Sequence, residues 1–239
     1  MILAAGLGTR LLPLTSRTPK ALVEIGGVTL LERTIDRLVD AGCDRIIINL
    51  HHHAERISEF LAGCTWPGAQ ILLSEEREAP LETGGGLKRA SHLFRGDRTI
   101  LLHNVDVISS IDLAALVRAH GTSGALATLA VNRRPASRHL VFDESGLCGR
   151  IDTRSGVEEW ARAPSVRQWR AGFTGIHALS PEILARLTEG GAFSIMRSYL
   201  RLAAAGARIL PLDVTGARWM DVGTPARLDE ARETWGRSA

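Results

Sequence analysis

The sequence has little of what marks several classes of protein. Its 239 residues include only three cysteines, at positions 43, 64 and 148, and no two of them share C-x-x-C spacing. A disulfide framework is therefore not expected, and such a chain suits a reducing cytosol. No stretch reaches the roughly 20 apolar residues that span a bilayer, and residues 1–6 lack the basic start and long apolar run of a secretion signal. We expect a cytoplasmic protein without a membrane segment.

The sequence also lacks any long run of one charge. The net charge is only +3, and the Lys and Arg residues are scattered along the chain. This mildly basic balance suits phosphates and other small anions and gives no support for nucleic acid as a partner. The composition, with 45% hydrophobic and 23% charged residues, is that of a globular protein with a substantial core. Because repeats and low-complexity linkers are absent too, we expect residues 1–239 to form a single domain.

What is present alternates strand with helix through the first half. Continuous apolar runs at residues 1–5, 45–50, 70–73 and 99–103 predict buried strands, and residues 30–39, 54–61, 84–94 and 113–119 predict helices. Such a series forms a parallel sheet with helices on both faces, and its ligands bind at the carboxyl ends of the strands. The predicted fold class is α/β, Rossmann-like, with a mixed but mostly parallel sheet.

The second half has shorter connections. Strands are predicted at residues 125–131, 139–142, 169–178 and 207–212, loops at 133–137 and 155–165, and helices at 181–187, at 193–205 and from Pro225. We divide the domain at this change of character, into residues 1–124 and residues 125–239.

A glycine-rich turn with two cations follows the first strand. Gly6 and Gly8 allow backbone N–H groups to approach a ligand closely and to form a concavity that binds anions. Arg10 and Lys20 add positive charge that suits a triphosphate. A Rossmann dinucleotide fingerprint would need a third glycine where this chain has Leu11, and no Gly-Lys-Ser/Thr closes the turn as in a P-loop. The segment therefore predicts a phosphate site of another type.

Residues 6–20, G-L-G-T-R-L-L-P-L-T-S-R-T-P-K, match the pattern GxGTR-(L/M)-x-PLT-x3-PK throughout. In this pattern the chain resembles the sugar nucleotidyltransferases, which include glucose-1-phosphate thymidylyltransferases and mannose-1-phosphate guanylyltransferases. The resemblance implies a nucleotide-diphospho-sugar transferase fold, with an NTP and a sugar-1-phosphate as substrates. It also implies that Gly6, Gly8 and Arg10 hold the NTP phosphates and that Lys20 contacts phosphates at the reacting centre. Residues 1–124 are then the nucleotide-binding half and residues 125–239 the acceptor-side half.

Two aspartates are candidates for a metal site. Asp106 follows the fourth predicted strand, and Asp221 precedes Thr224 and Pro225, which suit the N-cap and first position of a helix. Mg²⁺ prefers oxygen ligands and is commonly held by one or two carboxylates together with substrate phosphates. The resemblance implies that Asp106 and Asp221 bind the catalytic Mg²⁺. Relatives usually carry glycine before the first aspartate, whereas this chain has Val105, which alters the expected fit of the ribose or sugar.

A second glycine cluster, E-A-P-L-E-T-G-G-G-L at residues 78–87, lies between a predicted strand and a predicted helix. Its glycines allow close contact with a ligand, or they only make the start of the helix flexible. Relatives have a base-reading loop here, E-x-P-L-G-T-A-G, which Thr83, Gly84 and Gly85 match while Glu82 replaces a glycine. The form P-L-E-T-G-G-G resembles the N-acetylmuramate-1-phosphate uridylyltransferases of bacterial cell-wall recycling. The predicted nucleotide contacts are Leu3, Ala4, Ala5, Gly6, Gly8, Thr9, Thr83, Gly84, Gly85 and Asn104.

The acceptor side carries weaker signals. Residues 171–177, A-G-F-T-G-I-H, resemble the family's (S/A)-G-I strand near the sugar, which predicts sugar contacts at Gly172, Phe173, Thr174 and Gly175. The same glycines are equally compatible with close packing inside a strand. The Glu-Lys-Pro motif with which many relatives hold the sugar is absent from the sequence. The histidines at residues 51–53 predict a loop rather than a zinc site, because adjacent side chains diverge and no cysteine or carboxylate has ligand spacing.

Together these residues predict Mg²⁺-dependent nucleotidyl transfer. The second pKa of a phosphomonoester, about 6, leaves the attacking phosphate oxygen largely ionised, so no protein base is needed. Catalysis then depends on in-line positioning and on charge neutralisation by Mg²⁺, Arg10 and Lys20. UTP and N-acetylmuramate-1-phosphate are the expected substrates.

Three alternatives stay open at this point: a phosphocholine-type cytidylyltransferase, a guanylyl- or thymidylyltransferase for another sugar, and an inactive regulatory or binding subunit. The presence of Arg10, Lys20, Asp106 and Asp221 together disfavours the inactive subunit, because it has no chemical need for all four. The sequence does not decide between a monomer and a homo-oligomer, nor whether residues precede Met1.

Overall fold

The computed structural model describes residues 1–236. The α-helices are α1 (Leu30–Asp40), α2 (Ala54–Ala62), α3 (Glu82–Arg89), α4 (Leu113–Ser123), α5 (Ile195–Ala204) and α6 (Pro225–Trp235). Short 3-10 helices lie at Thr9–Leu11, Leu14–Ser16, Lys20–Leu22, Ala90–Leu93 and Pro181–Arg186. The strands are β1 (Ile2–Leu3), β2 (Glu24–Ile25), β3 (Val28–Thr29), β4 (Arg45–Leu50), β5 (Gln70–Glu75), β6 (Ile100–Asn104), β7 (Val107–Ser109), β8 (Ala127–Asn132), β9 (Arg138–Asp143), β10 (Gly146–Asp152), β11 (Val157–Trp160), β12 (Trp169–Leu179), β13 (Ile209–Asp213) and β14 (Trp219–Asp221).

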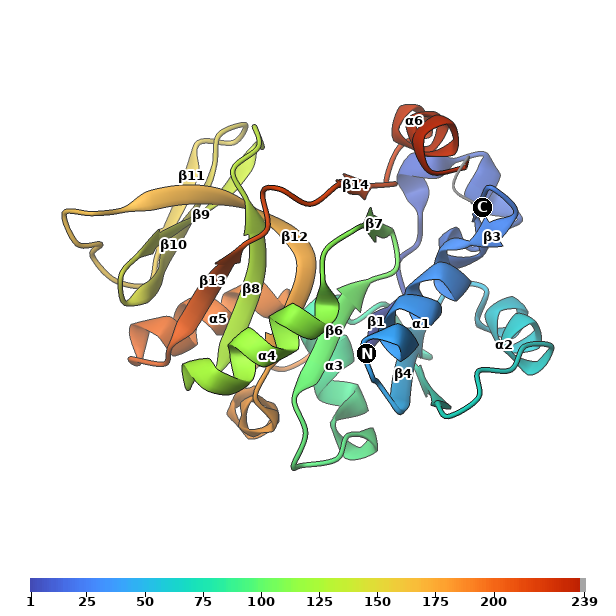
Figure 1. Ribbon diagram of the computed structural model, residues 1–239, viewed down its shortest axis with the longest axis horizontal. Helices are drawn as coiled ribbons and strands as arrows, with labels where there is room; N and C mark the ends of the chain where they lie inside the picture. Colours follow the sequence, from blue (N-terminus) through green and yellow to red (C-terminus); the bar gives the residue numbers. More distant parts are fainter. Residues whose placement is uncertain (237–239) are drawn as a thin grey trace.

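One sheet of ten strands runs through both halves of the chain (Figure 1). Its order is β11-β10-β9-β12-β6-β1-β4-β5, and β8 and β13 extend it beside β12. The strands β6, β1, β4 and β5 are parallel, as the alternating series predicts. The register aligns Leu3 of β1 with Asn49 of β4 and with Asn104 of β6, so these strands end at the same edge. The structure confirms the predicted α/β fold with its mixed sheet.

Helices cover both faces of the sheet. One apolar cluster buries Ile35 of α1, Leu116 of α4 and Leu228 of α6, and the cluster on the other face buries Leu87 of α3 and Tyr199 of α5. Figure 1 shows α1 and α4 in front of the sheet and α3 and α5 behind it. Within residues 1–236, no helix is both long enough and apolar enough to cross a membrane.

The acceptor-side half is built around β12, which pairs antiparallel with β6, β8 and β9. The loop expected at residues 155–165 is wrong over part of its length, because β11 lies within it and pairs with β10. The residues of β11, V-E-E-W, are mostly exposed and so carry no apolar alternation. Backbone pairing with β10, which was not predicted either, makes this segment a strand.

The helices of the second half differ from expectation at their starts. Within the predicted helix at residues 181–187, Pro181–Arg186 form a 3-10 helix rather than an α-helix. Helix α5 begins at Ile195 instead of residue 193, with Ser194 in an extended conformation as its N-cap. The carbonyl of Phe193 accepts hydrogen bonds from the amides of Gly84 and Gly85, at 2.9 and 3.2 Å. Phe193 therefore serves as a link to α3 and lies outside α5.

The last segment returns from the acceptor side to the first half through β14 (Figure 1). Strand β14 pairs antiparallel with β7, placing Asp221 opposite Val107, and the amide of Val222 donates to the carbonyl of Asp106 at 2.8 Å. Helix α6 then starts with Thr224 as its N-cap and proline at its first position, as predicted. Because β7 directly follows Asp106, this pairing brings together two aspartates that lie far apart in the sequence.

Candidate active site

A cavity of about 400 Å³ opens where β1, β4 and β6 end. The predicted site residues that line it are Leu3, Ala4, Ala5, Gly6, Gly8, Thr9, Arg10, Lys20, Thr83, Asn104 and Asp106. Leu7, Asn49, Pro80, Glu82, Val105 and Gly223 line it in addition. The glycine turn, the strand end that precedes Asp106 and the start of α3 therefore surround one space, as the common edge of parallel strands requires.

The glycine turn after β1 has a defined shape. Gly8 has a φ of 65°, in the left-handed region that favours glycine, and a 3-10 helix follows it directly. A Cβ on Gly8 would lie 2.9 Å from Cγ2 of the buried Thr15, whose hydroxyl donates to the Gly8 carbonyl at 2.8 Å. Leu11, where a Rossmann fingerprint has glycine, is a core residue with 2% exposure. The turn is therefore fixed by its own packing, while Gly6 has no other atom within 4 Å of the position of a Cβ.

A charged centre lies beside this turn. Lys20 Nζ donates to Asp106 Oδ2 in an ion pair whose side chains are 11% and 20% exposed. Burial raises the pKa of Asp221, and Asp106 raises it further, whereas the positive charges of Lys20, Arg10 and Arg134 lower it. Asp221 thus lies within electrostatic range of a second carboxylate and of three cations. Such a pair of carboxylates favours a further cation between them.

The donor set at this centre fits a magnesium ion. Asp106 and Asp221 offer only oxygen ligands, which Mg²⁺ prefers. Within residues 1–236, no group of three or more His, Cys, Asp and Glu side chains is placed to hold a metal ion. Two carboxylates completed by substrate phosphates and water are the usual surroundings of Mg²⁺ in enzymes that act on nucleotides.

Gly223 connects Arg10 to the same centre. A Cβ at this position would lie 2.5 Å from Asp221 Oδ1 and 2.6 Å from Arg10 Nη2. Only a residue without a side chain therefore allows the guanidinium and the carboxylate to approach the backbone here. The glycine in W-M-D-V-G-T has a steric reason that the spacing of the motif alone did not reveal.

Known proteins resemble the chain along nearly its whole length. Residues 1–237 match the sequence model of the family described as Nucleotidyl transferase. The chain belongs to this family. An N-acetylmuramate alpha-1-phosphate uridylyltransferase from Caulobacter vibrioides is 35% identical to it, over 97% of each protein.

Two further relatives of this nucleotidyl transferase differ in the substrates that their names state. Mannose-1-phosphate guanylyltransferase catalytic subunit beta from Drosophila pseudoobscura pseudoobscura is 31% identical over 94% of this chain and 59% of its own. A solved structure of a Bacillus anthracis protein described as a glucose-1-phosphate thymidylyltransferase has a TM-score of 0.81. It covers 100% of this chain and 94% of its own at 17% identity, so it supports the fold alone.

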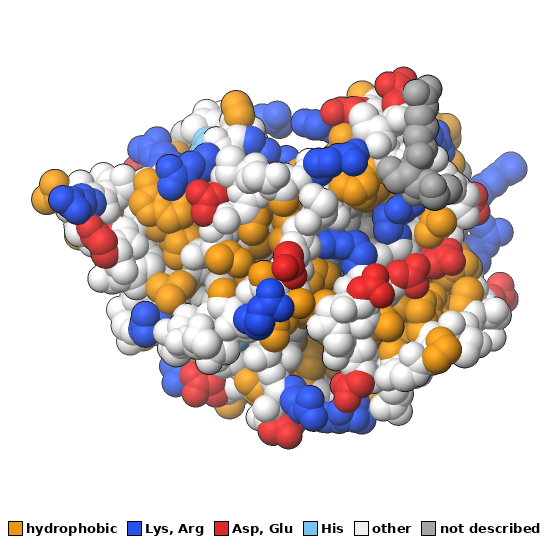
Figure 2. All heavy atoms as spheres, in the orientation of Figure 1, with side chains coloured by type: hydrophobic (Ala, Val, Ile, Leu, Met, Phe, Trp, Pro, Cys, Tyr) orange, Lys and Arg blue, Asp and Glu red, His pale blue; other side chains and the backbone are white. Residues whose placement is uncertain are grey.

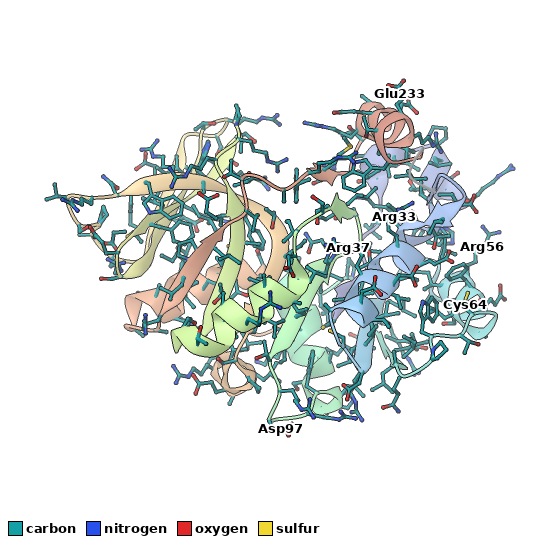
Figure 3. All side chains as sticks on the ribbon, in the orientation of Figure 1. Arg33, Arg37, Arg56, Cys64, Asp97 and Glu233 are labelled. Carbon is teal, nitrogen blue, oxygen red and sulfur yellow. The ribbon has the colours of Figure 1, made fainter. Side chains whose placement is uncertain are left out.

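Arg37 anchors the ribbon of β7 and β14 that carries the two aspartates of the nucleotidyl transferase. From α1 its guanidinium donates to Ser109 Oγ at 2.9 Å and also to the carbonyl of Ile111 (Figure 3). Both acceptors lie at or just beyond the end of β7. Asp106 and Asp221 are thus supported from the core of the first half.

A buried polar network ties the glycine turn to the segment before α3. Asn49 Oδ1 accepts from the amide of Ala4 at 2.7 Å, and Asn49 Nδ2 donates to Glu76 Oε1 at 2.6 Å. Glu76, which is 2% exposed, accepts from the amide of Leu81 with its other oxygen at 2.7 Å. A Cβ on Gly86 would lie 2.7 Å from both Asn49 Nδ2 and Glu76 Oε1. The network therefore fixes the glycine turn relative to the segment before α3, and no motif in the sequence predicted it.

Replacing Glu76 by glutamine is expected to destabilise the protein by about 1–3 kcal/mol. Both carboxylate oxygens accept hydrogen bonds, so the NH2 group of the glutamine must lie against one of the two N–H donors, and that hydrogen bond is lost. The shape of the side chain is nearly unchanged, so no cavity contributes. Urea denaturation of the wild type and Glu76→Gln measures the effect. The matched control is Glu75→Gln, since the Glu75 side chain is 49% exposed and pairs only with Arg77. Equal midpoints for the two variants would show that the network adds nothing to stability.

Gly84 and Gly85 lie away from the cavity lining, inside α3 and buried. A Cβ on Gly84 would lie 2.3 Å from the ring of Phe193, and one on Gly85 would lie 2.7 Å from the carbonyl of Gly191. Their amides also bond to the Phe193 carbonyl. These glycines are accounted for by the packing of α3 against the segment before α5. Thr83, by contrast, lines the cavity as predicted.

The predicted sugar contacts lie in β12, beside the cavity lining but outside it. Thr174 points into the core and donates to a backbone carbonyl of β8 at 2.8 Å. Gly175 has a φ of 82°, and a Cβ there would lie 2.8 Å from Asn104 Nδ2, so this glycine permits β12 to approach the end of β6. Gly172 and Phe173 pair with β8. Close packing thus accounts for Gly175 and Thr174.

The three histidines form the connection between β4 and α2. His51 Nδ1 bonds to the carbonyl of Glu76 at 2.6 Å, and the rings of His52 and His53 lie 3.9 Å apart. His53 has a φ of 55° directly before α2. The segment is a loop, as predicted, and it touches the buried network through His51.

Proposed function

We propose that this nucleotidyl transferase moves a nucleoside monophosphate from an NTP to a sugar-1-phosphate and releases pyrophosphate. The observation that carries the proposal is the convergence of Arg10, the Lys20–Asp106 ion pair and Asp221 beside one cavity with a glycine turn. Figure 2 shows Lys and Arg side chains along the upper edge of the molecule, between the β9–β11 side and α6. A positive field of this kind attracts anionic substrates.

The reaction depends on positioning and charge neutralisation. The attacking phosphate oxygen is largely ionised at neutral pH, because its second pKa is about 6. Amides of the glycine turn would hold the triphosphate, Arg10 would bind its oxygens, and Lys20 would face the phosphorus under attack. Asp106 and Asp221 would hold a magnesium ion. When bound, this ion supplies charge neutralisation and orientation of the phosphates.

Within this class of reaction we propose UTP and N-acetylmuramate-1-phosphate as the substrates. The uridylyltransferase relative has nearly the same length as this chain and 35% identity. The guanylyltransferase relative is longer, and this chain spans 59% of it. The segment P-L-E-T-G-G-G supports the same choice by its resemblance to uridylyltransferases for this sugar. A cytoplasmic location, which suits the three free cysteines, belongs to the same proposal.

Pyrophosphate release in the presence of Mg²⁺ tests the function across the common NTPs, a panel of sugar-1-phosphates and phosphocholine. We expect the highest rate with UTP and N-acetylmuramate-1-phosphate, and no release after chelation of divalent cations. Release with another pair would keep the reaction class and replace the substrates. Silence with every pair, from a protein with intact secondary structure, would contradict the reaction and favour a regulatory subunit.

A further inference from the structure

Arg134 is stacked on a tryptophan close to the charged centre. It lies in the loop between β8 and β9, and its guanidinium carbon is 3.1 Å from the ring centroid of Trp219. The indole is itself fixed, because Trp219 Nε1 donates to the carbonyl of Thr174 at 2.8 Å. A guanidinium held over an aromatic face keeps its N–H groups free at its edge.

No protein group uses those N–H groups within residues 1–236. Arg134 has no ion pair and no side-chain hydrogen bond there, and its Nε is buried without a partner. The adjacent Arg133 contrasts with it, since that side chain pairs with Asp213 at 3.0 Å. A half-buried arginine with an unpaired buried nitrogen costs stability unless a ligand supplies the acceptor.

The stacked arginine lies against the strand that carries Asp221. Trp219 and Asp221 are two residues apart in β14, so their side chains share one face of the strand. Since Arg134 stacks on Trp219, its guanidinium lies beside the residue that precedes Asp221 on this face of β14. Burial, together with the positive charge of Arg227, lowers the pKa of Arg134 to about 10, so it remains a cation at neutral pH.

We propose that Arg134, held on Trp219, binds the phosphate of the acceptor phosphomonoester. The inference rests on the proposed function and adds the acceptor-side cation that the missing Glu-Lys-Pro motif leaves unassigned. Arg10 and Lys20 come from the first twenty residues and line the nucleotide cavity, whereas Arg134 comes from the acceptor-side half. Planar guanidinium groups form paired hydrogen bonds with phosphate oxygens. The acceptor phosphate would thus be held between Arg134 and the centre formed by Asp221, Lys20 and Asp106.

The test is steady-state kinetics of wild type, Arg134→Gln and Arg134→Lys, varying each substrate separately. We expect Arg134→Gln to raise KM for the sugar phosphate about 10- to 100-fold, as for the loss of a charged hydrogen bond, with KM for the NTP within about twofold. Arg134→Lys should recover only part of the loss, because a lysine cannot form the paired bonds. Arg133→Gln is the matched control and should leave both KM values unchanged. Thermal melting of each variant checks that it is folded.

The outcomes separate the inference from the proposed function. If the wild type turns over a sugar phosphate and Arg134→Gln keeps the wild-type KM for it, only the inference is overturned. An equal rise of both KM values also overturns it, since the residue would then act on the fold of the site. If the wild type turns over no pair of NTP and sugar phosphate, the proposed function fails. Calorimetric titration with N-acetylmuramate-1-phosphate then tests whether Arg134 binds the acceptor phosphate. Binding that is lost in Arg134→Gln but kept in Arg133→Gln supports the inference, and unchanged or absent binding overturns it.

Discussion

Asp106→Asn and Asp221→Asn are each expected to lower the rate of pyrophosphate release by about 10³-fold or more, while the protein stays folded. Each substitution keeps the shape of the side chain and removes one negative oxygen. Several kcal/mol of charge stabilisation by a metal ion correspond to a rate loss of this size. The measurement is the turnover number at saturating substrates, repeated over a range of Mg²⁺ concentrations.

The stability of Asp221→Asn provides an independent check. Because the folded-state pKa of Asp221 is raised, chiefly by burial, its ionised form opposes folding as the pH rises through that pKa. A neutral asparagine removes this cost, so Asp221→Asn should melt at or above the temperature of the wild type at neutral pH. A large loss of stability would mean that inactivity came from unfolding.

The control for this pair is Asp229→Asn on α6, where the carboxylate is 70% exposed and only pairs with Arg232. It removes the same charge at a position close to Asp221 in the sequence and should leave the turnover number unchanged. Full activity in Asp106→Asn or Asp221→Asn would remove the metal assignment for that residue. A loss that high Mg²⁺ partly restores would support it, because a weakened site fills again by mass action.

The sequence predicted the first half of the fold well because its signals there are local. The runs 45–50 and 99–103 are continuous and apolar, and both are buried strands ending at the cavity. Strand β11 escaped prediction because its residues are mostly exposed and, within residues 1–236, it pairs with β10 alone. Such an edge strand is held by backbone hydrogen bonds to its neighbour, so its sequence shows no alternation of apolar and polar residues.

The structure brings together candidate site residues that were chosen by residue type, whereas the contacts around them that depend on packing were missed. Arg10, Lys20 and Asp106 line one cavity as expected. Asn49 and Glu76 were overlooked, although Asn49 interrupts the apolar run that ends at Leu50, which is a usable signal. The role of a glycine is hard to predict from sequence. A glycine that makes room for a ligand and one that makes room for a neighbouring ring, as Gly84 does for Phe193, give the same pattern. The catalytic roles stay predictions until the substitutions are measured.

Lys20→Ala is expected to reduce the turnover number about 10²- to 10³-fold with little change in KM for the sugar phosphate. Lys20 is one of only two lysines among 29 basic residues, so the chain holds an ammonium group here where it otherwise uses arginine. A compact point charge fits the narrow space beside Asp106, in which the lysine is 11% exposed. Its removal takes one cation from the reacting phosphates and leaves Asp106 without its ion pair, and both effects weaken the transition state more than the bound substrate.

Two further variants make the result specific to this charge. Lys20→Arg should also be slow, because the larger planar group must displace the cavity wall to reach Asp106. Lys88→Ala is the matched control, because Lys88 does not line the cavity and its Nζ donates to the carbonyl of Glu189 at 2.5 Å, so only stability should change. If Lys20→Ala changed the apparent affinity for the sugar phosphate and left the turnover number intact, Lys20 would act in acceptor binding. Neutralisation at the phosphorus would then fall to Arg10 and the metal ion, and Lys20 would share the role in acceptor binding that we propose for Arg134.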